Sequence, residues 1–556
     1  MIDFLKSKSG NIALSAAVML PALVGGVGMA IDYSRLTDAR SVLQQSADAA
    51  VLAAAKMPHN DAQRRQVFEQ VLRTNSGGDL RISKLDLAIR DTLNEVELTG
   101  TATADVDLIF LHQMGQHAVT VKASAYQATK NIAVSLVLDN TGSMGQAGID
   151  ALKKASHALV SAVESSAGDR TDIHMSLVPF VTAVNIKADG FDESWIDKDG
   201  KSLYNGWTFL NPALREARRN GERLAALPDN YADEINGVDQ ACNNQGEGQP
   251  AIEKREACQK RADAKVYPHA SKLFALSGTT WKGCVEARPS PYNLSVDAPS
   301  AAKPDTLFVP YFAPDEPGVS TSAGGNDANT FNNSWLNDAI TGADSLVQRS
   351  TLKYVRPDVK TIQEAKGVTR GPNRSCPTPV TPLTTDLSKI RAGIDAMQFW
   401  NGSGTNIPEG LAWGWRMLTP NAPFPQAEAL QFGDVTKYIV LMTDGRNVAY
   451  GGKNTINKSD YSSYGFLASE RIGGTTDQGK AETKQNEWTL QLCEAVKKTG
   501  IQIFTVVYNE KDQGVQNMFK KCATQPTNFF MADNTTALQA VFARIGANMS
   551  VLRLTQ

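Results

Sequence analysis

An uncharged stretch near the N-terminus constrains this chain more than any other feature. Residues 12–31 read IALSAAVMLPALVGGVGMAI and contain no acidic or basic side chain. About 20 helical residues rise about 30 Å, the thickness of the hydrocarbon core of a bilayer. A cleaved signal peptide is the alternative, but its apolar part is typically about 7–15 residues long and ends in an A-x-A-like site. The stretch is longer and has no clean site of that kind, so we predict an uncleaved transmembrane helix over 12–31.

The flanking charges predict the orientation of this helix. Lys6 and Lys8 precede the span, whereas acidic and basic residues are mixed beyond it. The positive-inside rule therefore places the N-terminus in the cytoplasm and the bulk of the chain outside. Apolar and small residues then recur at three- and four-residue steps until Pro58, which predicts one long, pilin-like helix within residues 1–57. Such a helix either packs on the following domain or associates laterally with other helices.

The length of 556 residues implies at least two folded parts, because single cores stop growing at roughly 250–300 residues. A net charge of -2 provides no basic excess for a nucleic-acid backbone, so nucleic acid is excluded as a partner. Residues 58–130 begin with a short helical pattern and continue with alternating runs such as VELTGTA. They predict a small α+β module rich in strands.

The hydrophobic pattern changes at Asn131. The run IAVSLVL is continuously apolar, as in a strand buried on both faces of a parallel sheet. Further strand candidates alternate with helical patterns, the last helix being predicted over 537–552, and this alternation predicts a doubly wound α/β domain over 131–552. A stretch rich in Pro, Gly, Asn and Asp, 185–382, is too long for an ordinary loop and predicts an inserted lobe. A shorter insertion is predicted over 446–485.

Oxygen-bearing side chains follow three predicted elements of this domain. Asp139 ends the first strand in LVLDNTGSM, and Asp444 leaves a later strand in LMTDG. Because the carboxyl ends of parallel strands meet at one sheet edge, we expect these loops to converge there. The predicted ligands are two carboxylates and three hydroxyls, and such a set suits Mg²⁺, Mn²⁺ or Ca²⁺ and is poor for Zn²⁺. The full set is Asp139, Thr141, Ser143, Thr405 and Asp444.

Two families resemble different parts of the chain. The N-terminal segment, with its Gly10 start, its Ala-Ile-Asp-Tyr exit and its Leu-Gln…Ala-Asp-Ala-Ala stretch, resembles the TadE/TadG-like proteins of Tad (Flp) pilus assembly. The order D-x-T-G-S, G-T-N, T-D-G resembles the metal-ion-dependent adhesion site (MIDAS) of von Willebrand factor A (vWA) domains, over 131–552 apart from the insertion. That resemblance implies an ion with one position open for an acidic side chain of a partner. Runs such as WKGCVEARP and TLFVPYFAPDEPG resemble the TadG-like subset specifically.

The six cysteines all follow the membrane span, as expected for disulfides in an oxidising periplasm. Six cysteines permit 15 pairings. We predict three bonds that nest without crossing, with buried free thiols as the alternative. These are Cys242–Cys258, Cys284–Cys376 and Cys493–Cys522.

The sequence carries no catalytic signature such as H-E-x-x-H or G-x-S-x-G in a suitable context, so no enzyme is predicted. The first hypothesis is an extracytoplasmic vWA protein, anchored in a bacterial inner membrane by a single pass, that binds a pilus-assembly component or surface ligand through the cation. The alternative is a pilin-like structural subunit or pilus-tip adhesin in which the metal only stabilises the fold. A metal-assisted hydrolase is a third class.

Overall fold

The structure is a computed structural model. It describes residues 8–55, 57, 61–77, 80–91, 95–110, 117–128, 131–166, 172–210, 212–221, 268–316, 333–336, 351–354, 357–359, 362–365, 368–402, 404–420, 423–431, 435–449, 457–549 and 552–555. The chain divides into two compact units. Unit 1 holds 1–130, 165–171 and 548–556, and unit 2 holds the remainder.

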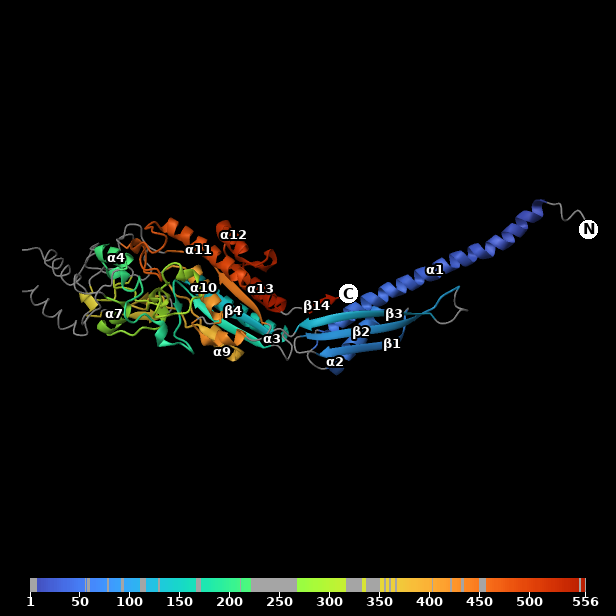
Figure 1. Ribbon diagram of the computed structural model, residues 1–556, viewed down its shortest axis with the longest axis horizontal. Coiled ribbons are helices and arrows are strands. Elements are labelled where there is room, and N and C mark those ends of the chain that lie inside the picture. The colour runs from blue at the N-terminus through green and yellow to red at the C-terminus, as the bar shows by residue number, and fades with distance from the viewer. Residues whose placement is uncertain are drawn as a thin grey trace, which may run out of the picture. The chain divides into compact units, whose positions relative to one another are not determined.

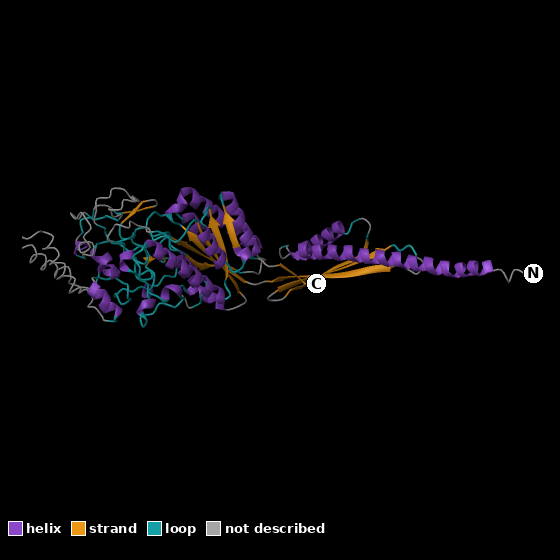
Figure 2. Ribbon diagram, turned by 90° about the horizontal axis from the view of Figure 1, so that it is seen from above, coloured by secondary structure: helices purple, strands orange, loops and turns teal. Residues whose placement is uncertain are grey.

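Unit 1 is built from a long helix, a short helix and an antiparallel sheet. Figure 2 shows the long helix running beside the strands. The sheet order is β1-β2-β3-β14, so the last strand of the chain pairs with β3. The elements are α1 (Lys8–Ala55), α2 (Asp61–Asn75), β1 (Arg81–Asp91), β2 (Glu95–Val106), β3 (His117–Ala128) and β14 (Leu552–Thr555).

The core of unit 1 follows from the two periodicities seen in its sequence. Leu43 and Ala47 of α1 are fully buried, and so are Val96 and Leu98 of β2, which alternate with residues on the other face. Gly100 of β2 permits the closest approach, because a Cβ atom there would lie 2.4 Å from the ring of Phe68. Tight packing of both helices on the sheet therefore fixes this unit.

One described helix is long and apolar enough to cross a membrane. The candidate span lies within Ala17–Ala55, and the test rests on length and composition alone. Side chains at the start of this range, such as Val18 and Leu23, are 71% and 66% exposed. α1 therefore has a free apolar end and a part that belongs to the core of unit 1.

Unit 2 is a mixed sheet with the order β13-β12-β11-β4-β5-β6-β7, and β10 pairs with β5 (Figure 1). The five strands from β13 to β5 run parallel, whereas β10 and β6 are antiparallel to β5. The strands are β4 (Asn131–Asp139), β5 (Ile173–Phe180), β6 (Val184–Asn185), β7 (Cys284–Val285), β10 (Thr381–Thr384), β11 (Val435–Thr443), β12 (Gln502–Tyr508) and β13 (Phe529–Ala532).

The chain winds in both directions from β4, which confirms the predicted doubly wound α/β class. It first moves to β5 and β10 on one side, and then returns to β11, β12 and β13 on the other. The order therefore reverses between β4 and β11, where such sheets bind ligands. The main helices are α3 (Gly145–Ser166), α9 (Leu387–Ala396), α10 (Ile407–Met417), α11 (Gln478–Lys498), α12 (Gln513–Cys522) and α13 (Thr535–Asn548).

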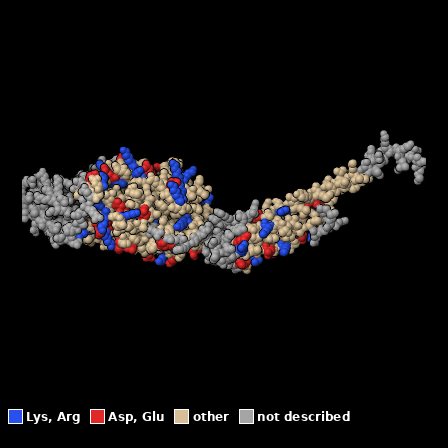
Figure 3. Space-filling view, viewed as in Figure 1, with Lys and Arg blue, Asp and Glu red and all other residues tan. Residues whose placement is uncertain are grey.

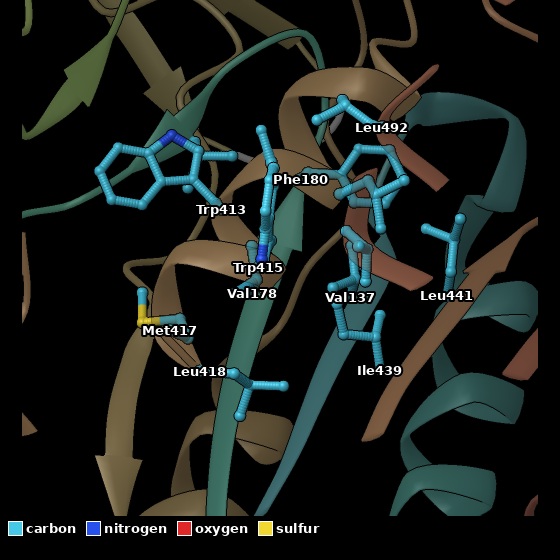
Figure 4. Close-up of a cluster of buried hydrophobic side chains, with 14 of the residues drawn as sticks. Val137, Val178, Phe180, Trp413, Trp415, Met417, Leu418, Ile439, Leu441 and Leu492 are labelled. Atoms are coloured by element: carbon cyan, nitrogen blue, oxygen red, sulfur yellow. The ribbon is translucent and has the colours of Figure 1, made fainter. Parts of the chain in front are cut away.

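A single large core holds β4 against the helices on one face. Val137 and Leu441 share a buried cluster with Trp413 of α10 and Leu492 of α11 (Figure 4). Gly414 allows α10 to lie directly on β4, since a Cβ there would lie 2.3 Å from Val137. Leu136 and Leu138 alternate with Val137 and are also fully buried, which explains the continuous apolar run of this strand.

The residues between β6 and β10 form short elements around a second core. They include α4 (Pro212–Arg219), α7 (Ala270–Leu276), β8 (Gln363–Ala365) and β9 (Val368–Arg370). Aromatic rings dominate the cluster, and Phe312 packs edge-on against both Phe274 and Tyr354. The described part of the predicted insertion thus has a core of its own.

Two predicted disulfides are confirmed, Cys284–Cys376 and Cys493–Cys522. The third prediction, Cys242–Cys258, lies outside the described residues. The structure moves two predicted boundaries, the end of the short insertion and the end of the last helix. α11 begins at Gln478, inside the predicted short insertion, because Asp477 caps its first turn by accepting from the Lys480 backbone N–H. The last helix ends at Asn548, and Leu552 begins strand β14 instead.

Candidate metal centre

The predicted carboxylates lie at the reversal point of the sheet. Asp139 is the last residue of β4, and Asp444 directly follows β11, its neighbour in the sheet. Residues 141–144 then form a tight turn before α3, in which Gly142 approaches another loop closely. A Cβ atom at Gly142 would lie 2.0 Å from the side-chain oxygen of Asn401. Only a glycine fits between these two loops without displacement.

Both oxygens of Asp139 accept hydrogen bonds inside the protein. The Thr141 backbone N–H donates to Oδ1 at 2.8 Å, and the Thr443 hydroxyl donates to Oδ2 at 2.6 Å. The side chain is fully buried, and burial raises the pKa of the Asp139 carboxyl although these hydrogen bonds lower it. Its position is therefore fixed, but its charge is poorly compensated.

A chain of hydroxyls connects the turn to the second carboxylate. The Thr141 and Ser143 hydroxyl oxygens are 2.9 Å apart, and the Ser143 hydroxyl donates to Asp444 Oδ1 at 2.8 Å. Four of the five predicted site residues thus lie in one hydrogen-bonded cluster. Ser143 is exposed, so the cluster reaches the solvent.

Burial and a neighbouring negative charge also shift the pKa of Asp444. Burial, and next the negative charge of Asp139, raise its pKa to about 7, and Glu510 adds a smaller effect in the same direction. The hydrogen bond from Ser143 opposes this shift. A bound divalent cation would reverse the balance, because its charge favours the ionised form of both carboxyls.

Thr405 lies on a loop whose backbone pairs with both of the segments that follow the two carboxylates. Its backbone exchanges two hydrogen bonds of 3.0 Å with Val448, which follows Asp444. Earlier in the same loop, the Trp400 N–H donates to the Asn140 carbonyl at 2.9 Å. Thr405 is buried, and its backbone pairing with Val448 places its loop beside the segment that follows Asp444. Among the described hydrogen bonds, none joins the Thr405 hydroxyl to the other four residues, so its role as a ligand stays a prediction.

Sequence reasoning missed Thr443, Asn401 and Glu510. Thr443 is part of the T-D-G motif, but its bond to Asp139 spans 304 residues of sequence and follows only from the pairing of β4 with β11. Glu510 follows the end of β12, and its carboxylate would lie 3.8 Å from a Cβ atom at Gly445. The one available signal was its position after the next parallel strand.

The donor set fits a hard cation. Within the described ranges, no three His, Cys, Asp or Glu side chains cluster as a metal site. A cation between Asp139 and Asp444 would therefore need hydroxyl ligands and water in addition to the carboxylates. Such all-oxygen coordination is what Mg²⁺, Mn²⁺ and Ca²⁺ prefer.

The strand order and this arrangement define a doubly wound α/β domain with a candidate cation site at the switch point of its sheet. The resemblance of this site to a MIDAS stays a prediction. Residues 10–57 match the family model described as "Putative Flp pilus-assembly TadE/G-like". The resemblance predicted for this segment is thereby confirmed, and the match covers α1 rather than unit 2. A search of curated proteins finds no match.

Several solved structures are similar over much of the chain. The pilus adhesin SpaC of Lactobacillus rhamnosus GG matches at 10% identity and a TM-score of 0.27, covering 84% of this chain and 34% of SpaC. The vWF domain of the type V pili tip protein Mfa5 of Porphyromonas gingivalis matches at 10% and 0.29, covering 76% and 95%. Proximal thread matrix protein 1 of the mussel byssus, with a zinc-occupied MIDAS motif, matches at 10% and 0.17, covering 77% and 97%.

The chain spans about a third of the length of the SpaC chain that it matches.

Proposed function

We propose that this protein is a membrane-anchored, extracytoplasmic binding protein of a pilus apparatus. It holds an acidic side chain of a protein partner through a divalent cation. The proposed ligands are Asp139, Thr141, Ser143, Thr405 and Asp444. The observation that carries this proposal is the pairing of a buried carboxylate, Asp139, with a half-buried one, Asp444, both with raised pKa and joined through hydroxyls at the switch point of the sheet.

The residues of the cluster have different roles in this proposal. Asp139, held by Thr141 and Thr443, has the fixed position of a group that orients ligands. Ser143 and Asp444 lie nearer the solvent and present oxygens toward it. When bound, the cation supplies a positive charge to which a partner carboxylate adds. Such an arrangement serves binding. The proposal includes no group that would activate a substrate for a chemical reaction.

The pilus assignment rests on the N-terminal segment. Its family model is described as pilus assembly, and its match spans the apolar part of α1. A segment of this kind supports an anchor in the inner membrane with the vWA-type domain outside the cytoplasm. The two disulfides support the same compartment, because disulfides persist where the surroundings are oxidising.

Metal binding tests the site directly. Full-length protein in detergent is titrated with Mn²⁺ and free ion is followed by electron paramagnetic resonance. We expect binding that Asp139→Ala abolishes. Asp150→Ala is the matched control, because Asp150 lies exposed on α3 a few residues further along. Equal binding by the wild type and Asp139→Ala would reject the proposed site.

Partner capture tests the role. The same proteins are used as bait for solubilised membrane and pilus fractions, with Mg²⁺ or with EDTA. The proposal expects a partner that is retained with Mg²⁺ by the wild type and by Asp150→Ala, and lost with EDTA or Asp139→Ala. Capture unchanged by both treatments would show that binding does not use the metal.

A pilin-like structural subunit is the second candidate. It is favoured by the exposed apolar end of α1, which would pack equally well among helices of a fibre. Shearing cells and fractionating the products separates the candidates. A subunit copurifies with sheared fibres, whereas an anchored binding protein stays with detergent-extractable membranes.

A further inference from the structure

The surroundings of α1 change abruptly at Gly28. Before it, Val18, Leu23 and Val27 are exposed on different sides of the helix. From Gly28 onward, one face of α1 is buried against the rest of unit 1. The buried residues recur at helical intervals of three or four positions, or at sums of these intervals. This face includes Gly28, Asp32, Ala39 and Leu43. Gly28 is therefore the first residue at which the long helix meets its own module.

The segment that meets α1 there follows strand β2. The backbone N–H groups of Ile109 and Phe110 donate to the two carboxylate oxygens of Asp32, each at 2.9 Å. Arg35 donates to the Asp107 carbonyl at 3.3 Å. The Phe110 ring lies against Gly28, where a Cβ atom would come within 2.5 Å of it. Residues 107–110 thus contact α1 about one helical turn before the uncharged stretch ends.

Two side chains of this segment are nevertheless about half exposed. Ile109 is 56% exposed and Phe110, although its ring contacts Gly28, is 47% exposed. Two hydrogen bonds to Asp32 hold their backbone, so loose packing does not explain the exposure. Tyr33, at the end of the apolar stretch, is 73% exposed as well. Apolar and aromatic side chains therefore gather around the helix at the level where its charges begin.

We propose that Ile109 and Phe110 form a second membrane contact, which enters the interface of the bilayer beside α1. This proposal rests on the membrane anchoring given above. Gly28 and Asp32 are four residues apart, about 6 Å along the helix, and interfacial side chains penetrate about 5–10 Å. The two backbone donors satisfy the Asp32 carboxylate, which removes the cost of an unpaired charge at that depth.

Lipid fits this surface better than a second copy of the chain. Association of helices buries one stripe, whereas Val18, Leu23 and Val27 are exposed on different sides of α1. The described part of this helix end carries no charge on the face drawn in Figure 3. Phe110 lies against Gly28, within the uncharged stretch, so Ile109 and Phe110 adjoin this end. A helix anchored alone can tilt, but a helix with a second contact beside it sets the angle of unit 1 to the membrane.

Depth-dependent quenching tests the contact in the full-length protein. Single cysteines replace Ile109, Val24 or Ala88 and carry an environment-sensitive NBD dye, in nanodiscs with nitroxide-labelled lipids. Val24 reports the middle of the apolar stretch, and Ala88 is exposed on β1. Unlabelled and dye-treated wild-type protein corrects for reaction at native cysteines. We expect a blue-shifted emission at 109 that shallow nitroxides quench most, deep quenching at 24, and none at 88.

The outcomes separate the two proposals. Quenching at 24 but not at 109 overturns the second contact and leaves the anchor intact. Quenching at neither position overturns the anchor itself. Protection at 109 that depends on protein concentration and not on nitroxide lipid identifies a second copy as the occupant, and also overturns the proposal.

A matched pair of glycine variants tests the geometry. Gly28→Ala places a methyl group in the space of the Phe110 ring, whereas nothing lies within 4 Å of a Cβ atom at Gly26. We therefore expect Gly28→Ala to reduce quenching at 109 and Gly26→Ala to leave it unchanged, with position 24 constant in both. Equal quenching in both variants would show that the seat of Phe110 on Gly28 does not place the segment.

Discussion

Carboxylates with raised pKa occur in unit 2 in two different settings. At the candidate metal centre, the described partners of Asp139 and Asp444 are hydroxyls, a backbone N–H and each other's charge. Glu286 lies beside the guanidinium of Arg471 and accepts from the Tyr461 hydroxyl. Burial raises the pKa of Glu286 too, but Arg471 opposes that shift. The second setting contains its own countercharge, and the first has the composition of a site that takes a cation from solution.

The largest loss of folding stability is expected when the countercharge of Glu286 is removed. Arg471→Met leaves Glu286 buried beside an apolar side chain, and loss of one partner of a buried pair typically costs about 3–5 kcal/mol. Thermal and denaturant unfolding measure the loss. Arg219→Met is the control, because its ion pairs are exposed. A loss no greater than that of the control would contradict the structural role of the pair.

Added cation should stabilise the folded protein by binding at the candidate metal centre. A ligand that binds only the folded state at 100 times its dissociation constant contributes about 2.7 kcal/mol. We expect Mg²⁺ to raise the unfolding temperature of the wild type and Arg471→Met, but not of Asp139→Ala. An equal rise in Asp139→Ala would place the ion elsewhere.

The pH dependence distinguishes the same two settings. The pKa of Asp444 is raised from its ordinary value near 3.8 to about 7, so the folded state binds more protons than the unfolded state between these values. Without metal, its contribution to stability is therefore lost as pH rises from about 4 to 7. Asp444→Asn should show a smaller decline than the wild type over this range in EDTA. Parallel curves would contradict the shift.

The smallest effect is expected from exchange of one hydroxyl. Thr141→Ser keeps the oxygen that contacts Ser143, so Mg²⁺-dependent stabilisation should persist. Thr141→Val keeps the volume and removes the oxygen. A typical hydrogen bond contributes about 0.5–1.5 kcal/mol, and we expect a loss of that size in the Mg²⁺-dependent part. Identical Mg²⁺ responses of Ser and Val variants would exclude Thr141 as a ligand.

The sequence predicted those parts that local pattern decides. The apolar run of β4 and the strand exits at Asp139 and Asp444 indicated both the parallel sheet and the meeting of the two loops. The bond from Thr443 to Asp139 and the pairing of the loop of Thr405 with Val448 join distant segments. Such contacts have no local signal, because they depend on strand order and register.

The same distinction explains the boundary errors. VLRL after Asn548 continues an apolar pattern that suits helix and strand equally. This segment forms a strand because it pairs with β3, which is far away in sequence. The aromatic core around Phe312 was missed for a related reason, since its rings come from separate segments of the insertion without a common period.

The pairing of β14 with β3 also imposes an order on synthesis. Residues 552–555 complete the sheet of unit 1, yet they follow the whole of unit 2 along the chain. Chains emerge from the ribosome with the N-terminus first. β3 therefore remains an open sheet edge throughout the time needed to make unit 2. Open edges invite pairing with foreign strands, so the closing strand protects unit 1 only after unit 2 has been synthesised.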